Sequence, residues 1–141
     1  MHVVGDIHQP LHATSQFSAA FPKGDQGGNR LVLRANSIAK NLHSYWDRGG
    51  GFLKTSKHYP KNLLAKKAYS IEKHWPCELQ KMNLNPEVWA AESQRLARTQ
   101  AYQIKSGQKP SKKYQQSVKL ITEQRLALAG CRLAALLNNL A

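Results

Sequence analysis

Hydrophobic positions recur at helical spacing through the second half of the chain. Residues 60–75 place apolar side chains three and four positions apart, and Pro76 follows them, which predicts a helix that ends there. Residues 86–104 begin with a proline, which the first turn of a helix tolerates, and predict a second helix. A long third helix is predicted over 112–139, with Ser111 as its N-cap. The pattern therefore predicts a mostly α protein.

The longest predicted helix carries a broad apolar stripe near the period of 3.6 residues. Its members are Val118, Ile121, Leu126, Ala129, Leu133, Leu136, Leu137 and Leu140. Gly130 interrupts this helix, and glycine inside a helix costs about 1 kcal/mol relative to alanine. We therefore expect another part of the chain to pack closely against Gly130.

The first half of the chain shows weaker periodicity. Residues 1–9 look like the end of a helix, because a proline follows them. Residues 13–30 predict a loop that ends in a glycine-rich turn, and the loosely alternating stretch 29–34 predicts a short strand or β-hairpin. A further helix is predicted over 38–47, with Ser37 as its N-cap and three glycines beyond its end.

Length and charge narrow the classes of protein. The chain has 141 residues, so residues 1–141 are expected to form a single domain. Its formal net charge is +13, which favours polyanionic partners such as nucleic acid or an anionic membrane surface. A positive charge of this size can also serve solubility alone or reflect adaptation to an acidic compartment. No apolar run approaches the roughly 20 residues of a transmembrane helix, and the chain shows no signal peptide.

The two cysteines, Cys77 and Cys131, are too few for a disulfide framework and do not have the spacing of metal ligands. They can form one bridge in an oxidising compartment or remain two buried thiols. The sequence leaves both alternatives open.

Histidine–aspartate pairs are the strongest chemical signal. Asp6 follows His2 by four residues, and Asp47 follows His43 by four, so each pair can share one helical face. Imidazole nitrogen and carboxylate oxygen are the ligands of catalytic zinc, which usually takes three protein ligands and leaves one position open. His12 together with His43 and Asp47 makes such a set. A single pair of this kind is more often a surface ion pair or a cap.

The segments around these pairs resemble a known family. The run HVVGDIHQPLH at 2–12 and the run NLHSYWD at 41–47 look like two signatures of the zinc-dependent single-strand-specific nucleases, the S1/P1 nuclease family. GGN at 27–29 falls between them as in the family, and WAAES at 89–93 and AGCRLAALLN at 129–138 are similar to its closing helices. The resemblance spans nearly the whole chain in family order.

The resemblance implies a mostly helical fold, shared with zinc phospholipases C, that holds three zinc ions in a cleft. It implies that His2 and Asp6 bind a close pair of zinc ions, with Asp6 as the catalytic carboxylate that bridges them. It implies that His12, His43 and Asp47 together bind the third zinc.

Two further motif residues, His8 and Asn29, are not assigned as metal ligands. His8 is expected to orient a ligand carboxylate or to pack beside it. Asn29 is expected either near the metal ions or as part of the Gly-Gly turn, and we favour the turn.

The chain departs from the family in one respect. The close zinc pair of the family needs further ligands that come from upstream, so we expect that an N-terminal part is missing and that this chain has one fully liganded zinc site. Without upstream helices, part of the apolar stripe over 112–139 should be uncovered.

The resemblance implies a secreted or periplasmic zinc-dependent endonuclease that hydrolyses single-stranded DNA and RNA and leaves 5′-phosphates, with nucleic acid as its partner and no stable protein partner. Two alternatives remain at this stage. One is a phosphodiesterase like zinc phospholipase C, and the other is a non-catalytic fragment that binds zinc or nucleic acid.

Overall fold

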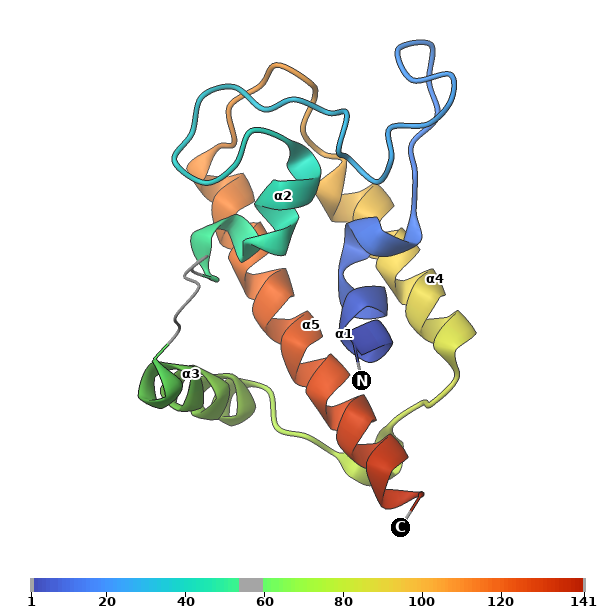
Figure 1. The fold of residues 1–141 in the computed structure, drawn as a ribbon, viewed down its shortest axis with the longest axis vertical. Coiled ribbons are helices and arrows are strands. Elements are labelled where there is room, and N and C mark those ends of the chain that lie inside the picture. Colours follow the sequence, from blue (N-terminus) through green and yellow to red (C-terminus); the bar gives the residue numbers. More distant parts are fainter. Residues whose placement is uncertain (1, 54–59, 141) are drawn as a thin grey trace.

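The computed structural model describes residues 2–53 and 60–140 as a mostly helical protein (Figure 1). The α-helices are α1 (His2–His8), α2 (Leu42–Asp47), α3 (Lys61–His74), α4 (Pro86–Leu96) and α5 (Lys112–Asn138). Short helical turns follow α1, α2 and α4 at Pro10–Ala13, Gly49–Gly51 and Ala97–Ala101, and another occupies Leu79–Lys81. The predicted fold class is confirmed in its helical part.

Helix α5 is the longest element, and the other helices are arranged around it (Figure 1). Helix α1 packs against both α4 and α5, while the turn after α2 packs against the first half of α5. Helix α3 lies beside α5 and buries none of its residues 61–74. The loops 14–41 and 102–111 lie together at the upper end of the molecule in Figure 1.

The predicted start of α5 is confirmed, because the Ser111 hydroxyl accepts a hydrogen bond from the backbone N–H of Tyr114 at 3.1 Å. Only part of the apolar stripe is buried. Leu126 and Leu137 are among the exposed large hydrophobic residues, as expected. The expectation of close packing at Gly130 is wrong for the described residues, because a Cβ built there would meet none of their atoms within 4 Å.

The predicted strand or hairpin at 29–34 is also wrong within the described residues. Val32 and Asn41 form one isolated antiparallel bridge. The amide of Leu33 donates to the carbonyl of Lys40 beside this bridge, but the amide of Arg34 donates to the carbonyl of Gln108 in another loop. The backbone partners of this stretch come from different segments, so no continuous ladder forms.

Helix α2 begins later than the helix predicted over 38–47. Its N-cap is Asn41, whose side-chain oxygen accepts from the N–H of Ser44 at 2.8 Å, and not Ser37. The side-chain oxygen of Asn36 accepts from the backbone N–H groups of Ile38 and Ala39. These bonds hold the stretch before α2 in a turn.

The main core joins α2 to the C-terminal end of α4 and to the N-terminal part of α5. Trp46 and Tyr45 are almost fully buried there, and Trp46 Nε1 donates to the Tyr114 hydroxyl at 3.0 Å. Helix α4 ends at Leu96, earlier than predicted, and the chain continues in the π-helical turn Ala97–Ala101. The Tyr114 hydroxyl donates to the carbonyl of Ala101 at 2.6 Å, so α2, this turn and α5 are held together.

A disulfide joins Cys77 to Cys131, with their Cα atoms 5.4 Å apart. It ties the segment after α3 to the second half of α5. The structure therefore decides between the two alternatives that the sequence left open. None of the described helices is both long and apolar enough to span a bilayer.

Candidate metal centre

Helix α2 presents His43 and Asp47 on one face, one turn apart, as their spacing predicts. His43 Nε2 lies 3.5 Å from Asp47 Oδ2. The other ring nitrogen, Nδ1, lies 2.8 Å from the carbonyl oxygen of Gly27. A carbonyl only accepts, so Nδ1 donates to it, and Nε2 is the ring nitrogen that faces Asp47.

The Gly-Gly turn brings this carbonyl to His43. Gly27 has a φ of +61°, and a Cβ on it would lie 2.4 Å from the carbonyl oxygen of Leu11. Only glycine fits both conditions. Asn29 closes the same turn, since its side-chain amide donates to the carbonyl of Gln26 at 2.9 Å.

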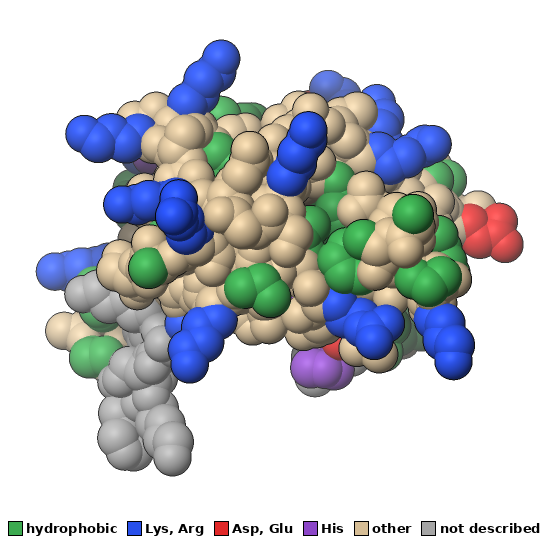
Figure 2. All heavy atoms as spheres, turned by 90° about the horizontal axis from the view of Figure 1, so that it is seen from above, with side chains coloured by type: hydrophobic (Ala, Val, Ile, Leu, Met, Phe, Trp, Pro, Cys, Tyr) green, Lys and Arg blue, Asp and Glu red, His purple; other side chains and the backbone are tan. Residues whose placement is uncertain are grey.

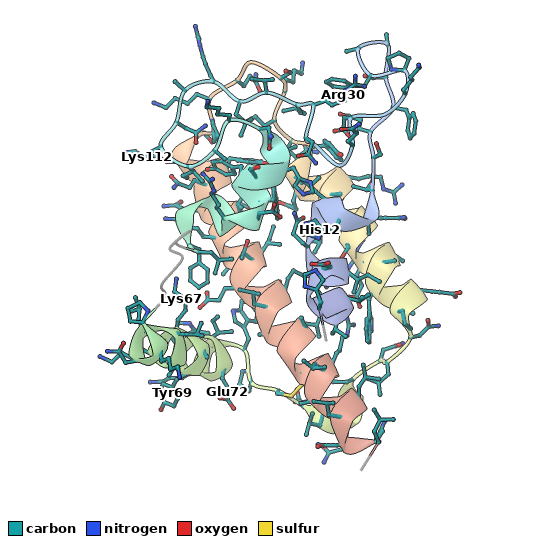
Figure 3. The ribbon with its side chains drawn as sticks, in the orientation of Figure 1. His12, Arg30, Lys67, Tyr69, Glu72 and Lys112 are labelled. Carbon is teal, nitrogen blue, oxygen red and sulfur yellow. A yellow bond between two sulfur atoms is a disulfide. The ribbon has the colours of Figure 1, made fainter. Side chains whose placement is uncertain are left out.

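His12 comes from the short helical turn after α1 (Figure 3). Its side chain lies against His43 and Asp47 of α2. Its ring stacks on that of His43, with centroids 5.0 Å apart and planes 11° apart. His12 Nε2 lies 3.0 Å from Asp47 Oδ1. One ligand atom from each residue lies within 4.8 Å of the other two. Zinc binds nitrogen and oxygen at about 2.0–2.2 Å, so small side-chain shifts would bring all three onto one ion.

The charges in this group favour a bound cation. The hydrogen bond with Asp47 raises the pKa of His12 above its ordinary value, despite burial. Burial alone would raise the pKa of Asp47, but hydrogen bonds from His12 and Gln9 outweigh it, and the pKa is lowered. The carboxylate of Asp47 is thus ionised and stabilises positive charge at His12. A bound metal ion would supply this positive charge instead of a proton on His12.

His2 and Asp6 lie beside this group but complete no second group with the residues that the structure describes. His2 Nε2 is 3.0 Å from Asp6 Oδ2, and the His2 side chain is 89% exposed. Asp6 Oδ1 is 3.7 Å from His12 Nδ1. Among the described residues, the cluster of three potential ligands contains His12, His43 and Asp47 and neither member of this pair.

A cavity of about 670 Å³ opens next to these side chains. Asp6, His12 and His43 line it, together with Gly27 and apolar residues of α1. A ligand in this cavity would contact the potential metal ligands directly.

Gln9 is a site residue that sequence reasoning missed. Its side-chain amide donates to Asp47 Oδ1 at 2.9 Å, while its side-chain oxygen accepts from the N–H of Leu11. Gln9 therefore links the turn that carries His12 to the carboxylate of α2. The motif contains this glutamine, but an amide is not a usual zinc ligand, so nothing in the sequence singled it out.

His8 is buried away from the candidate ligands. The expected contact with a ligand carboxylate is not formed in the described part of the chain. Instead Nδ1 lies 2.6 Å from the carbonyl oxygen of Val4, and Nε2 lies 2.8 Å from a guanidinium nitrogen of Arg132. Its ring packs on Trp89 with centroids 5.3 Å apart. Burial lowers the pKa of His8 to about 4.

Comparison with known proteins identifies the family of this chain. A family model described as S1/P1 nuclease matches residues 1–141. The chain belongs to the S1/P1 nuclease family.

Plant and fungal nucleases are among its relatives. The chain is 33% identical to Endonuclease 1 of Arabidopsis thaliana over 149 residues, which are 97% of this chain and 46% of that protein. It is 35% identical to Endonuclease 4 of the same plant over 151 residues, which are 99% of this chain and 48% of that protein. It is 29% identical to Nuclease S1 of Aspergillus oryzae over 161 residues, which are 100% of this chain and 52% of that protein. The chain thus spans about half the length of these curated relatives.

S1/P1 nucleases are zinc-dependent, and the group of His12, His43 and Asp47 fits this metal. Two imidazole nitrogens and one carboxylate oxygen are a common ligand set of catalytic zinc. The ring of His43 is already oriented by a backbone carbonyl, which is typical of histidines that bind zinc.

Proposed function

We propose that this chain contributes a zinc site to a zinc-dependent endonuclease that hydrolyses phosphodiester bonds of single-stranded DNA and RNA and leaves 5′-phosphates. The observation that carries the proposal is the convergence of His12, His43 and Asp47 from two separate segments, within 4.8 Å of one another. His12, His43 and Asp47 would hold one zinc ion. The resemblance to the family also assigns His2 and Asp6 to a close zinc pair, with Asp6 as the bridge.

Bound zinc supplies Lewis acidity, which neutralises charge on phosphoryl oxygens and makes a bound water more acidic. The residues of this chain prepare the site for that chemistry. Gly27 and Gln9 orient His43 and Asp47 through hydrogen bonds. The adjacent cavity of about 670 Å³ is open to solvent and has room for a phosphodiester and its neighbouring sugars.

The charge of the protein supports a polyanionic substrate. The net charge is +13. Figure 2 shows Lys and Arg side chains spread over the upper end of the molecule, with acidic side chains only near its edge. Arg30 and Lys112 belong to this end (Figure 3). Counterion release would then make nucleic-acid binding weaken steeply as salt rises.

One observation favours a second function, the binding of zinc or nucleic acid without turnover. The pair of His2 and Asp6 gains no third ligand from the described residues. A chain with the site of His12, His43 and Asp47 alone would bind one zinc ion.

The disulfide bears on location. Disulfides persist in oxidising compartments and are rare where thiols are kept reduced. The Cys77–Cys131 bridge therefore supports a secreted or periplasmic location, as the family resemblance implies.

A zinc-binding measurement combined with a cleavage assay tests the proposal. Asp47→Asn keeps the shape of the side chain and removes its charge, so zinc affinity should fall by at least about 100-fold, because a direct ligand loses more than the 10–100-fold typical of its supporting partners. Glu123→Gln is the matched control, since Glu123 pairs with His74 at 3.1 Å outside the site. Its zinc affinity should equal that of the unaltered chain.

The cleavage assay separates the two functions. Zinc-dependent release of 5′-phosphate ends from a single-stranded DNA oligonucleotide, lost in Asp47→Asn, is the expected result for the endonuclease. Zinc binding without cleavage would contradict turnover by this chain and support binding alone. Equal zinc affinity in Asp47→Asn and Glu123→Gln would contradict the zinc site of His12, His43 and Asp47.

A further inference from the structure

Four polar residues of α4 and α5 form a largely buried cluster against the end of α1. They are Glu92, Ser93, Arg125 and Arg132, and we call them the arginine clamp. We propose that the arginine clamp is a positioning device for the metal centre, which fixes the end of α1 and through it His12. This inference rests on the proposed function, because it assigns the clamp to the same zinc site.

The clamp binds the last carbonyl groups of α1. Arg125 Nε donates to the carbonyl of His8 at 3.0 Å, and the Ser93 hydroxyl donates to the carbonyl of Ile7 at 2.6 Å. These carbonyls have no partner within the helix, because the last four of any α-helix lack one. Side chains from two other helices therefore fix where α1 ends and in which direction the chain leaves it.

A third contact passes through the ring of His8. Its Nδ1 must donate, since its partner is the carbonyl of Val4, and its Nε2 must then accept from Arg132. His8 is consequently a neutral imidazole held at both nitrogens. Its ring cannot rotate without breaking one of these bonds, so the clamp also fixes the orientation of the final turn of α1.

Glu92 makes the two arginines act together. One of its carboxylate oxygens accepts from both Arg125 and Arg132 at 2.8 Å, and the other accepts a second hydrogen bond from Arg132 at 2.8 Å. Arg125 is 7% exposed and Arg132 is 3% exposed. A buried guanidinium without its carboxylate is strongly destabilised, so the cluster is expected to form as a whole or not at all.

The residues that the clamp holds lie between the candidate ligands. Ile7 and His8 follow Asp6 directly, and His12 is one helical turn beyond them. The N–H of His12 donates to the carbonyl of Gln9 at 3.1 Å, so the connection between them is a short hydrogen-bonded turn. A displacement of the backbone at His8 would therefore also displace His12.

Helix α5 holds the other half of the site as well. Its Tyr114 hydroxyl accepts from Trp46, and the side-chain amide of Gln115 donates to the carbonyl of Gly50 at 2.9 Å, so α2 and the turn after it are docked on the first part of α5. The clamp docks α1 on a later part. The separation between His12 and Asp47 is thus set by two sets of contacts on one helix.

The test compares two serines changed in the same way. Ser93→Ala removes the hydroxyl that binds Ile7, and Ser117→Ala removes a hydroxyl of α5 that donates to the side chain of Gln100 at 3.3 Å. Arg125→Lys keeps the charge but loses the fork of donors. For each full-length variant, the zinc dissociation constant is measured by competition with a chromophoric chelator, and the cobalt-substituted protein is examined by visible absorption. Circular dichroism checks that each metal-free variant has the helix content of the unaltered chain.

We expect Ser93→Ala and Arg125→Lys to weaken zinc binding by about 10-fold to 100-fold, the range seen when groups that support metal ligands are removed. The cobalt absorption bands should shift, because ligand geometry changes. Ser117→Ala, the control, should leave the zinc affinity and the cobalt spectrum unchanged.

Each outcome is decisive. If the clamp variants fold and match the unaltered chain in zinc affinity and cobalt spectrum, the clamp only stabilises the fold and the inference is wrong, while the proposed function stands. If the unaltered chain binds no zinc, the proposed function itself fails. Should Arg125→Lys not fold, Ser93→Ala decides, because it changes one hydroxyl group.

Discussion

The carboxylate of Asp47 receives hydrogen bonds from two different residues of the segment that follows α1. Gln9 and His12 both reach its Oδ1 atom, at 2.9 and 3.0 Å. The position of this oxygen is therefore set before a metal ion arrives. Preorganisation of this kind reduces the cost of binding, because less rotational freedom of the side chains is lost.

Replacing Gln9 with alanine should weaken zinc binding by about tenfold, at the lower end of the range for groups that orient a ligand. The physical reason is the loss of the amide that holds Asp47. Gln94→Ala is the matched control, because this glutamine donates to the carbonyl of Ala13 in the same turn and does not touch Asp47. Chelator competition measures both affinities. Similar values for the two variants would show that Gln9 has no role in orienting Asp47.

The two ligand pairs were within reach of sequence reasoning, whereas their partners were not. The i,i+4 spacing placed His43 beside Asp47, because that spacing is local. Gln9 and His8 lie in the same motif, but their contacts are to residues 38 and 124 positions away. Such contacts depend on tertiary packing, which spacing does not reveal.

At the scale of elements, local signals predicted some boundaries well. Helix α3 spans Lys61–His74 and α5 spans Lys112–Asn138, close to the predicted 60–75 and 112–139, because prolines and an N-cap serine act locally. The stretch 29–34 was misjudged, since its backbone groups bind partners in several distant segments. The clamp could not be foreseen either, because glutamate, serine and arginine on a helix ordinarily face water.

The junction of α1, α4 and α5 should give the protein a defined sensitivity to acid. Burial alone would raise the pKa of Glu92, but hydrogen bonds and charges from Arg132 and Arg125 outweigh it and lower the pKa to about 2 from 4.5. The unfolded chain therefore takes up this proton first as the pH falls. The stabilisation is complete above pH 4.5 and is lost progressively toward about pH 2.

Urea unfolding between pH 7 and pH 2 measures this loss, with Glu92→Gln as the comparison. The variant should be less stable at pH 7, and the difference from the unaltered chain should shrink below pH 4.5 as Glu92 becomes protonated. A difference that stays constant over this range would show that the ion pairs of Glu92 do not depend on its charge.

For the whole molecule, the Cys77–Cys131 disulfide compensates for a limited core. Helix α3 has no buried residue among 61–74, and several large apolar side chains of α5 are exposed. The covalent link between two residues 54 positions apart restricts the unfolded chain, which stabilises the fold where burial of these side chains does not. A core that leaves so much apolar surface exposed gains from such a constraint.

Replacing both cysteines with serine should lower the free energy of unfolding by up to about 4 kcal/mol, the chain-entropy value for a loop of this length. Urea titration under non-reducing conditions measures the change. The unaltered chain in reducing buffer serves as control and should unfold at the same urea concentration as the variant. An unchanged midpoint after both treatments would mean that the bridge adds no stability.

The two docking points on α5 also constrain how this family member can change in length. Gln115 and Arg125 belong to one continuous helix, so one added or deleted residue between them would turn the downstream side chains by about 100° relative to the upstream ones. Arg125 and Arg132 would then no longer point at α1. Insertions and deletions are accordingly expected in the loops that join the helices, while this stretch of α5 tolerates exchange of side chains only.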